Sequence, residues 1–259
     1  MNHLEHNRRA WNQGVMSGSI WAQPVDEATI AQARTGTWEV VLTPKTPVPK
    51  AWFGDLRGQR VLCLASGGGQ QAPILAAAGA TVVSFDLSEE QLRKDQLVAE
   101  RDRLDLHCVR GDMTDLSCLA AASFDLIFHP VSNVFVPDLA SVWRECHRVV
   151  RPGGALLAGF MNPAMFLFDH HEAESTGQLL AKFRLPYSDQ ASLSPAQLQA
   201  KLDRNEPLEF SHSLTAQIGG QIEAGFLLAG LYEDHWLDDT WLFSNFSPVS
   251  IATRALRPR

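Results

Sequence analysis

The chain has 259 residues, of which 45% are hydrophobic, and a formal net charge of −7 with a pI near 5.7. This length and composition can bury the core of one large domain, or of one domain with an inserted cap. The acidic balance argues against nucleic acid as a partner, because nucleic-acid binders usually carry a basic surface. The N-terminus is polar and no apolar run reaches the roughly 18–20 residues of a membrane span, so we expect a cytoplasmic protein without a membrane partner.

Residues 1–56 are rich in tryptophan and end in a proline-rich stretch, which predicts an N-terminal cap segment over the ligand-binding edge of the fold. From residue 60 onward, short apolar runs alternate with amphipathic or alanine-rich runs. The pattern predicts strands over 60–66, 81–86, 106–112, 124–130 and 155–160, and helices over 72–79, 88–102 and 139–154. Strands separated by helices favour a parallel sheet with helices on both faces. Right-handed crossovers then place the carboxyl ends of the strands along one edge, where such sheets bind ligands.

The alternation stops after residue 160 and resumes near residue 214. We expect the residues from about 161 to 212 to form an insertion, with one helix over 193–204. A helix over 214–226 and two strands, in "FLLAGLYED" and "SPVSIATRAL", then complete a sheet of seven strands. The sequence therefore predicts an α/β, doubly wound, mostly parallel sheet, in which residues 57–259 form the main domain around the insertion.

The four cysteines are scattered along the chain, and no histidine stands at zinc-finger spacing from them. We therefore expect reduced thiols and no metal site.

A glycine-rich stretch, "ASGGGQQA", follows the first predicted strand. Gly67, Gly69 and Ala72 have the G-x-G-x-x-A spacing of a dinucleotide-binding loop, and Asp86 follows nineteen residues after Gly67, at the end of the second strand. Glycines let the backbone approach a ligand closely, and a carboxylate in this position accepts hydrogen bonds from ribose hydroxyls. Both features suit NAD and S-adenosylmethionine equally well.

Motifs further along the chain favour S-adenosylmethionine. "GDM" (111–113) places Asp112 at the end of the third strand, where it can hold an adenine amino group while Met113 packs against the ring. Together with it, "VLCLASGGG", "SFDLS", "FDLIF" and "RVVRPGGALL" closely resemble the class I S-adenosylmethionine-dependent methyltransferases, over roughly residues 60–160. The resemblance implies a Rossmann-like methyltransferase fold with an antiparallel last strand. It also implies methyl transfer from S-adenosylmethionine, with S-adenosylhomocysteine as the product.

The resemblance assigns roles to the residues that match the family's motifs. The glycine loop would surround the methionine end of the cofactor, Asp86 would bind the ribose, and Leu87 would cover the adenine. The residues after the fourth strand would lie beside the sulfonium. The cofactor-binding residues implied are Ala65, Ser66, Gly67, Gly68, Gly69, Gln70, Asp86, Leu87, Asp112, Met113, His129 and Pro130.

Two positions depart from the family's pattern. Cys63 stands where the family usually has an acidic residue in the first strand, and Ala65 stands where it has a glycine. Loss of the acid removes an anchor of the glycine loop, and Gln70 or Gln71 is the candidate to compensate for it.

Methyl transfer from a sulfonium needs a base only if the acceptor carries a proton at neutral pH. His129 is the candidate base, because it follows the fourth strand on the reactive edge. The acidic surface and the insertion favour a small-molecule acceptor, which the sequence does not identify. The candidate substrate contacts are Trp11, Asn133, Asn162 and Tyr187.

Two other functions remain open from the residues alone. The glycine loop and Asp86 also fit an NAD(P)-binding Rossmann oxidoreductase, in which Asp112 would make no contact with the adenine. The missing acid at Cys63 is compatible with a non-catalytic cofactor-binding protein of the same fold.

Overall fold

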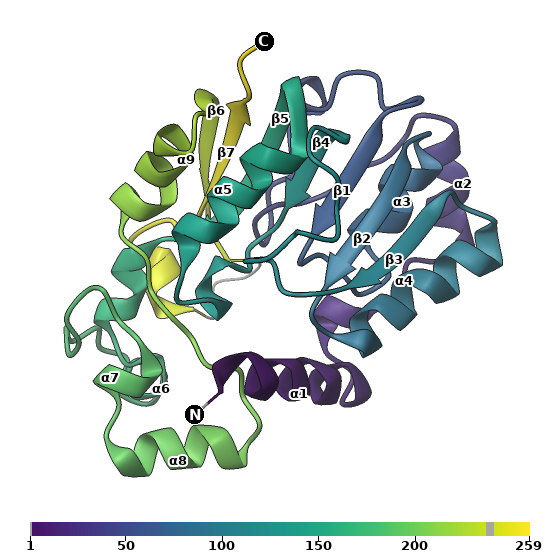
Figure 1. Cartoon of the computed structure of the whole chain (residues 1–259). Helices are drawn as coiled ribbons and strands as arrows, with labels where there is room; N and C mark the ends of the chain where they lie inside the picture. The colour runs from purple at the N-terminus through teal and green to yellow at the C-terminus, as the bar shows by residue number, and fades with distance from the viewer. Residues whose placement is uncertain (1, 237–240) are drawn as a thin grey trace.

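The computed structural model describes residues 2–236 and 241–259. Seven strands form one sheet in the order β3-β2-β1-β4-β5-β7-β6 (Figure 1). The strands are β1 (Arg60–Leu64), β2 (Thr81–Asp86), β3 (Leu106–Arg110), β4 (Phe124–His129), β5 (Val150–Met161), β6 (Leu227–Asp234) and β7 (Ser250–Leu256). The pairs among β1 to β5 are parallel, whereas β7 is antiparallel to both of its neighbours. The predicted seven-stranded sheet and its antiparallel last strand are confirmed.

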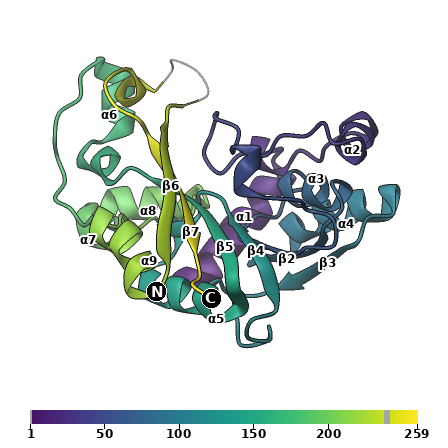
Figure 2. The same cartoon turned by 90° about the horizontal axis from the view of Figure 1, so that it is seen from above.

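Alternate residues of the central strands belong to two separate cores. Val61 and Cys63 of β1 belong to the core under α2 (Glu27–Arg34), α3 (Gln71–Ala77) and α4 (Glu89–Asp102). Leu62 and Leu64 belong to the core under α5 (Leu139–Val149). Figure 2 shows α2 and α3 on one side of the sheet and α5 on the other. Because both faces are covered, these strands are apolar at successive positions, which is the pattern of a parallel sheet.

The boundary between α5 and β5 differs from the prediction. The predicted helix over 139–154 is wrong at its carboxyl end, since α5 ends at Val149 and the R-P-G-G stretch belongs to β5. Val150 pairs with Phe124, and the register with β4 then shifts before it resumes at Leu126 and Ala155. Pairing with β4 therefore takes this stretch into the sheet, and the irregular register accommodates Pro152, which has no N–H to donate.

The predicted helix over 214–226 is divided in two. A π-helical turn over Thr215–Gly219 precedes α9 (Gly220–Glu223). The indole Nε1 of Trp143 donates to the carbonyl oxygen of Ala216 at 2.9 Å, within this turn. A side chain that takes a carbonyl from the helical hydrogen-bond ladder favours such a local widening.

The N-terminal segment and the insertion both lie at the carboxyl edge of the parallel strands. The first helix, α1 (His3–Met16), crosses this edge next to the insertion helices (Figure 1). The side chain of Asn7 joins α1 to the segment after β4 and to the insertion. Nδ2 of Asn7 donates to the carbonyl oxygens of Phe135 and Leu208, and its Oδ1 accepts from the Leu208 amide at 2.7 Å. The N-terminal residues thus pack over the carboxyl edge of the parallel strands.

The remaining elements are short. The insertion contains α6 (His170–Thr176), α7 (Asp189–Ser192) and α8 (Pro195–Asp203), the last with a capping box at Ser194. The 3₁₀ turns are Ile20–Ala22, Lys50–Trp52, Asn133–Phe135, Pro163–Leu167 and Leu242–Asn245. None of the helices in the described part of the chain is long and apolar enough to span a membrane.

Candidate functional site

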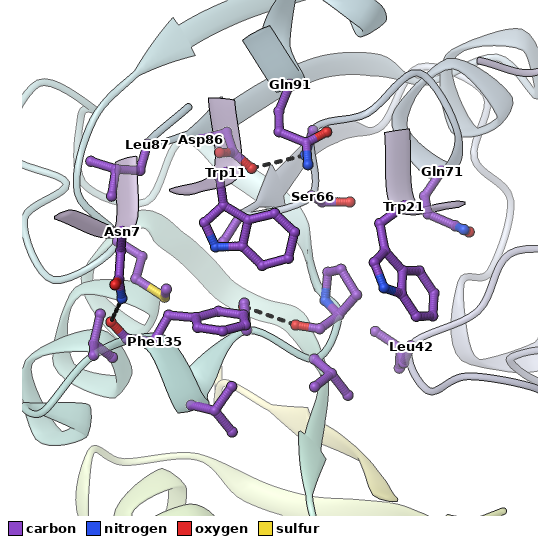
Figure 3. Close-up of a pocket in the computed structure, with 18 of the residues that line it drawn as sticks. Asn7, Trp11, Trp21, Leu42, Ser66, Gln71, Asp86, Leu87, Gln91 and Phe135 are labelled. Atoms are coloured by element: carbon purple, nitrogen blue, oxygen red, sulfur yellow. Dashed lines mark hydrogen bonds between the residues drawn. The ribbon is translucent and has the colours of Figure 1, made fainter. Parts of the chain in front are cut away.

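A cavity of about 300 Å³ lies at the carboxyl edge of the sheet, between the sheet, α1 and the insertion. Figure 3 shows the indole of Trp11 between Asp86 and Phe135 in this cavity. One end is formed by the glycine loop and by the segments that follow β2 and β3. The other end is formed by residues of the N-terminal segment and of the segments after β4 and β5, together with Trp236 and Trp241. The residues at this second end include Leu42, Pro44, Val131, Val134, Val136, Met161, Glu209, Trp236 and Trp241.

The three glycines of the loop each donate their N–H to another part of the protein. Gly67 donates to Oδ2 of Asp86 at 3.0 Å, Gly68 to the carbonyl oxygen of Gln91 at 3.0 Å, and Gly69 to Oδ1 of Asp95 at 2.7 Å. These N–H groups are therefore engaged within the protein, and the loop meets a ligand mainly through the close approach of its backbone.

Gly68 shows why this loop needs glycine. Its φ is +127°, and a Cβ atom there would lie 2.3 Å from the carbonyl oxygen of Trp21. A side chain would thus collide with the N-terminal segment as well as strain the backbone.

Ala65 occupies the loop position where the resembling family has glycine. Its φ is +49°, in the left-handed region that glycine adopts without strain. The loop therefore keeps the backbone conformation of a glycine at a residue that has a Cβ atom.

Asp86 holds two segments together at the end of β2. Its Oδ1 accepts from the amide of Ser88 at 2.9 Å, and its Oδ2 accepts from Gly67. Desolvation by the surrounding protein raises the pKa of this carboxyl, and the backbone N–H donors partly oppose that rise. Its carboxylate borders the cavity, so its remaining lone pairs can accept hydrogen bonds from a ligand.

Asp95 of α4 is a buried carboxyl that the sequence analysis did not single out. It is 0% exposed, and its Oδ2 accepts from the hydroxyl of Ser84 at 2.5 Å while its Oδ1 holds Gly69. Burial raises the pKa of Asp95 to about 7, and the neighbouring charge of Asp86 adds to the rise. The signal in the sequence is its position: Asp95 stands three residues after Leu92 and four before Ala99, on the buried stripe of an amphipathic helix.

Gln70 and Gln71 do not anchor the glycine loop. Nε2 of Gln70 donates to the carbonyl oxygen of Ile20 at 2.8 Å, and Oε1 of Gln71 accepts from the amide of Val41 at 2.9 Å. The hypothesis that these side chains replace the strand acid is wrong, because both bind the N-terminal segment instead.

Most of the residues singled out from the sequence border the cavity. Asp112 and Met113 do so from the turn after β3, which ends at Arg110 rather than at residue 112. The predicted residues that line the cavity are Trp11, Ala65, Ser66, Gly67, Gln70, Asp86, Leu87, Asp112, Met113 and Pro130. Gly68 and Gly69 lie behind this surface, in the loop that supports it.

His129 and Asn133 are not among the residues that line the cavity. The His129 ring is 0% exposed, with Nδ1 2.9 Å from the carbonyl oxygen of Leu64 and Nε2 2.8 Å from Oδ1 of Asn133. Nδ2 of Asn133 in turn donates to Oε1 of Gln217 at 2.8 Å. Burial lowers the pKa of His129, so the neutral ring is favoured. The structure thus places both side chains in a buried network that ties β4 to its following segment.

Asn162 and Tyr187 are engaged elsewhere. Oδ1 of Asn162 caps the turn at Ala164, and its Nδ2 donates to the carbonyl oxygen of Pro248 at 2.9 Å. The hydroxyl of Tyr187 donates to Oδ1 of Asp189 at 2.6 Å inside the insertion, where burial raises its pKa.

Several cavity residues could not be assigned from the sequence, because they come from segments without a recognisable motif. Trp236 and Trp241 stack with their ring centroids 4.2 Å apart, and Trp21 meets Trp236 edge to face at 6.2 Å. The tryptophans themselves are visible in the sequence, but the sequence does not show that they meet at the same cavity. No three His, Cys, Asp or Glu side chains lie close enough to share a metal ion within the described ranges.

The chain is similar to known methyltransferases. Residues 62–158 match the family described as "Methyltransferase domain". The uncharacterized methyltransferase YbaJ of Bacillus subtilis is 49% identical over 231 residues, which cover 89% of this chain and 90% of that protein. A ubiquinone biosynthesis O-methyltransferase of Xanthomonas oryzae is 32% identical over 157 residues, or 60% of this chain and 64% of that protein.

Solved structures share the fold. An S-adenosylmethionine-dependent methyltransferase of Mesorhizobium loti superposes with a TM-score of 0.61 at 19% identity, over 80% of this chain and 95% of the other. The 1,6-didemethyltoxoflavin-N1-methyltransferase of Burkholderia thailandensis, solved with that compound and S-adenosylhomocysteine, has a TM-score of 0.59 at 14% identity, over 98% and 88% of the two chains. From the shared fold, the extended similarity to YbaJ and the matched motifs, the chain belongs to the class I S-adenosylmethionine-dependent methyltransferases, and S-adenosylmethionine is its cofactor.

Proposed function

We propose that this protein transfers the methyl group of S-adenosylmethionine to a small, largely apolar acceptor by in-line displacement. The observation that carries the proposal is that one continuous cavity joins the cofactor loop to an aromatic end under α1. A site of this size and composition suits a small molecule.

The residues at the first end of the cavity fit the cofactor. Asp86, Asp112 and Met113 line this end, and in our proposal the Asp86 carboxylate binds the ribose while Asp112 and Met113 bind the adenine. Ser66 Oγ and Gln91 Oε1 are buried at the same end without a hydrogen-bond partner in the protein. Buried polar atoms are rarely left unsatisfied, so these two atoms support a polar ligand beside the glycine loop, such as the methionine end of the cofactor.

The charge of the cavity supports a cationic cofactor and an acceptor that is not anionic. Its charged side chains are Asp86, Asp112 and Glu209, and no lysine, arginine or histidine is among the described residues that line it. Carboxylates stabilise a nearby sulfonium cation, whereas a phosphate-rich acceptor would meet repulsion. Nucleic acid is therefore not the acceptor that we propose.

The second end of the cavity suits an apolar ring. Its walls are mainly indole, phenyl and aliphatic side chains, with Trp11 and Phe135 in edge-to-face contact at 5.0 Å. The relatives agree with this chemistry. The Xanthomonas protein is named for O-methylation in ubiquinone biosynthesis, and the Burkholderia structure holds 1,6-didemethyltoxoflavin.

The bound cofactor supplies an electrophilic methyl group on a sulfonium that is already a good leaving group. The protein's task is to exclude water and to align the acceptor atom with that methyl group, and such orientation can supply several kcal/mol of barrier reduction. Since the ring of His129 does not border the cavity, we propose that orientation, rather than an imidazole base, drives the reaction.

Calorimetry and a methylation assay test the proposal. We expect the purified protein to bind S-adenosylhomocysteine and not NAD, and to methylate neutral aromatic hydroxy or amino compounds in preference to their carboxylated analogues and to RNA. Binding of NAD alone would overturn the cofactor assignment. Preference for the carboxylated compounds or for RNA would overturn the acceptor class.

A further inference from the structure

We infer that Asp95 on α4 takes over the task of the acidic residue that the first strand lacks at Cys63, and that it positions the glycine loop for the cofactor. In this chain the carboxylate that anchors the loop therefore stands on α4, whereas the resembling family has it on the first strand.

The first support is the fit between α4 and the loop. A Cβ atom on Gly67 would lie 2.7 Å from Cβ of Gln91, and one on Gly69 would lie 3.0 Å from the carbonyl oxygen of Lys94. The carbonyl oxygen of Gln91 also accepts from Gly68. The glycine loop therefore packs directly against the backbone of α4, and the side chain of Asp95 accepts a hydrogen bond from the loop's last glycine.

The second support is the chemical environment of Asp95. Its hydrogen-bond donors in the described structure are the amide of Gly69 and the hydroxyl of Ser84, neither of which is a cation. A buried carboxyl without a cationic partner is costly for stability, and an apolar residue would suit the stripe of α4 better. Cys63 is fully buried and pairs in register with Ser84 of β2, the residue whose hydroxyl donates to Asp95. Asp95 therefore lies beside the strand position where the family's acid would stand.

Asp95 acts through the loop, because it does not itself border the cavity. Gly69 ends the run of glycines that begins at Gly67, and Ser66 and Gly67 line the cavity. Fixing Gly69 at one end, while Asp86 fixes Gly67 at the other, sets the shape of the surface on which the cofactor lies. Asp95 is thus a positioning residue.

The affinity for S-adenosylhomocysteine, measured by calorimetry on the full chain, tests the inference. Asp95→Leu removes the acceptor and puts an apolar side chain in its place, and we expect the affinity to fall about tenfold or more, as for other hydrogen bonds to charged groups. Asp95→Asn keeps an oxygen that can accept from Gly69, so it should recover most of the affinity. Glu100→Leu, on the exposed side of the same helix, is the control and should bind as the wild type does.

Moving the carboxyl back to β1 gives a second measurement, which separates positioning from stability. Cys63→Asp alone should weaken binding, because two carboxyls would then be buried together. Cys63→Asp combined with Asp95→Ala should bind more tightly than Asp95→Ala alone.

The inference is overturned if folded Asp95→Leu, with a cooperative thermal transition, binds within twofold of the wild type. It is also overturned if Asp95→Asn binds as weakly as Asp95→Leu. If the wild type itself does not bind S-adenosylhomocysteine, the cofactor assignment fails instead, so the two failures are distinguishable.

Discussion

The indole of Trp11 meets the ring of Phe135 edge to face, with ring centroids 5.0 Å apart and ring planes at 82°. This contact joins α1 to the segment after β4 beside the cavity, and both rings line it. The N-terminal helix is therefore part of the site and not only a cover for the sheet.

Removal of the Trp11 ring should loosen this side of the cavity. Trp11 lines the cavity, and an aromatic contact with a ligand is worth about 0.5–1.5 kcal/mol, so we expect Trp11→Ala to weaken ligand binding by roughly threefold to tenfold. Calorimetry with S-adenosylhomocysteine, alone and with an acceptor, measures the change. Trp38→Ala is the matched control: Trp38 packs on Phe53 away from the cavity, and its loss should lower stability without changing affinity.

Asp86→Ala should abolish most cofactor binding. The change removes the proposed ribose contacts and also frees the amides of Gly67 and Ser88, and each lost hydrogen bond to a charged group is worth roughly 1.5–3 kcal/mol. Asp125→Ala is the control, because Asp125 holds the amide of Arg60 outside the cavity. Unchanged affinity in Asp86→Ala, measured by the same titration, would contradict the ribose assignment.

Ala65→Gly should stabilise the protein. A left-handed conformation costs an L-residue roughly 1–2 kcal/mol, and the greater freedom of glycine in the unfolded chain offsets part of that gain. We therefore expect the free energy of unfolding to rise by up to about 1 kcal/mol in urea denaturation. Ala122→Gly is the matched variant, since Ala122 has a φ of +52° in a turn away from the cavity. A loss of stability in both variants would show that the two residues are not strained.

His129→Gln separates a buried structural ring from a catalytic base. Loss of a general base typically lowers the rate by 10²–10⁴. Because the ring is buried and hydrogen-bonded to Leu64 and Asn133, we expect a loss of stability but less than a tenfold drop in kcat. Steady-state kinetics and thermal unfolding check the two effects separately. A larger drop in kcat with unchanged stability would support His129 as a general base.

Asp95 should make stability depend on pH. Its pKa rises from 3.8 to about 7 on folding, so the folded state binds the proton more tightly. The resulting stabilisation is complete below about pH 4 and is lost as the pH rises to about 7, by at most about 4 kcal/mol. The other titratable groups coupled to it are Asp86, Cys63 and Cys108. Denaturation at pH 5 and pH 8 should therefore show a smaller loss for Asp95→Asn than for the wild type, and equal losses would contradict the prediction.

The fold was predictable because its signals are local. Apolar strand runs, helix caps such as Ser88 and the glycines after β1 are each determined by a few neighbouring residues. The position of Asp86 at the end of β2 follows from the same local pattern. In contrast, the boundary at Val150 depends on pairing with Phe124, which is distant in sequence.

The alternation of strands and helices, the sheet edge where the cavity lies and the motifs of the cofactor site were predictable from the sequence, because each depends on short-range periodicity and spacing. The folded structure was needed to show that His129 is buried outside the cavity, that Trp11 contacts Phe135 beside it, and that Asp95 holds the loop. These relationships join side chains from separate elements. They depend on how the helices pack against the sheet, which no local pattern specifies.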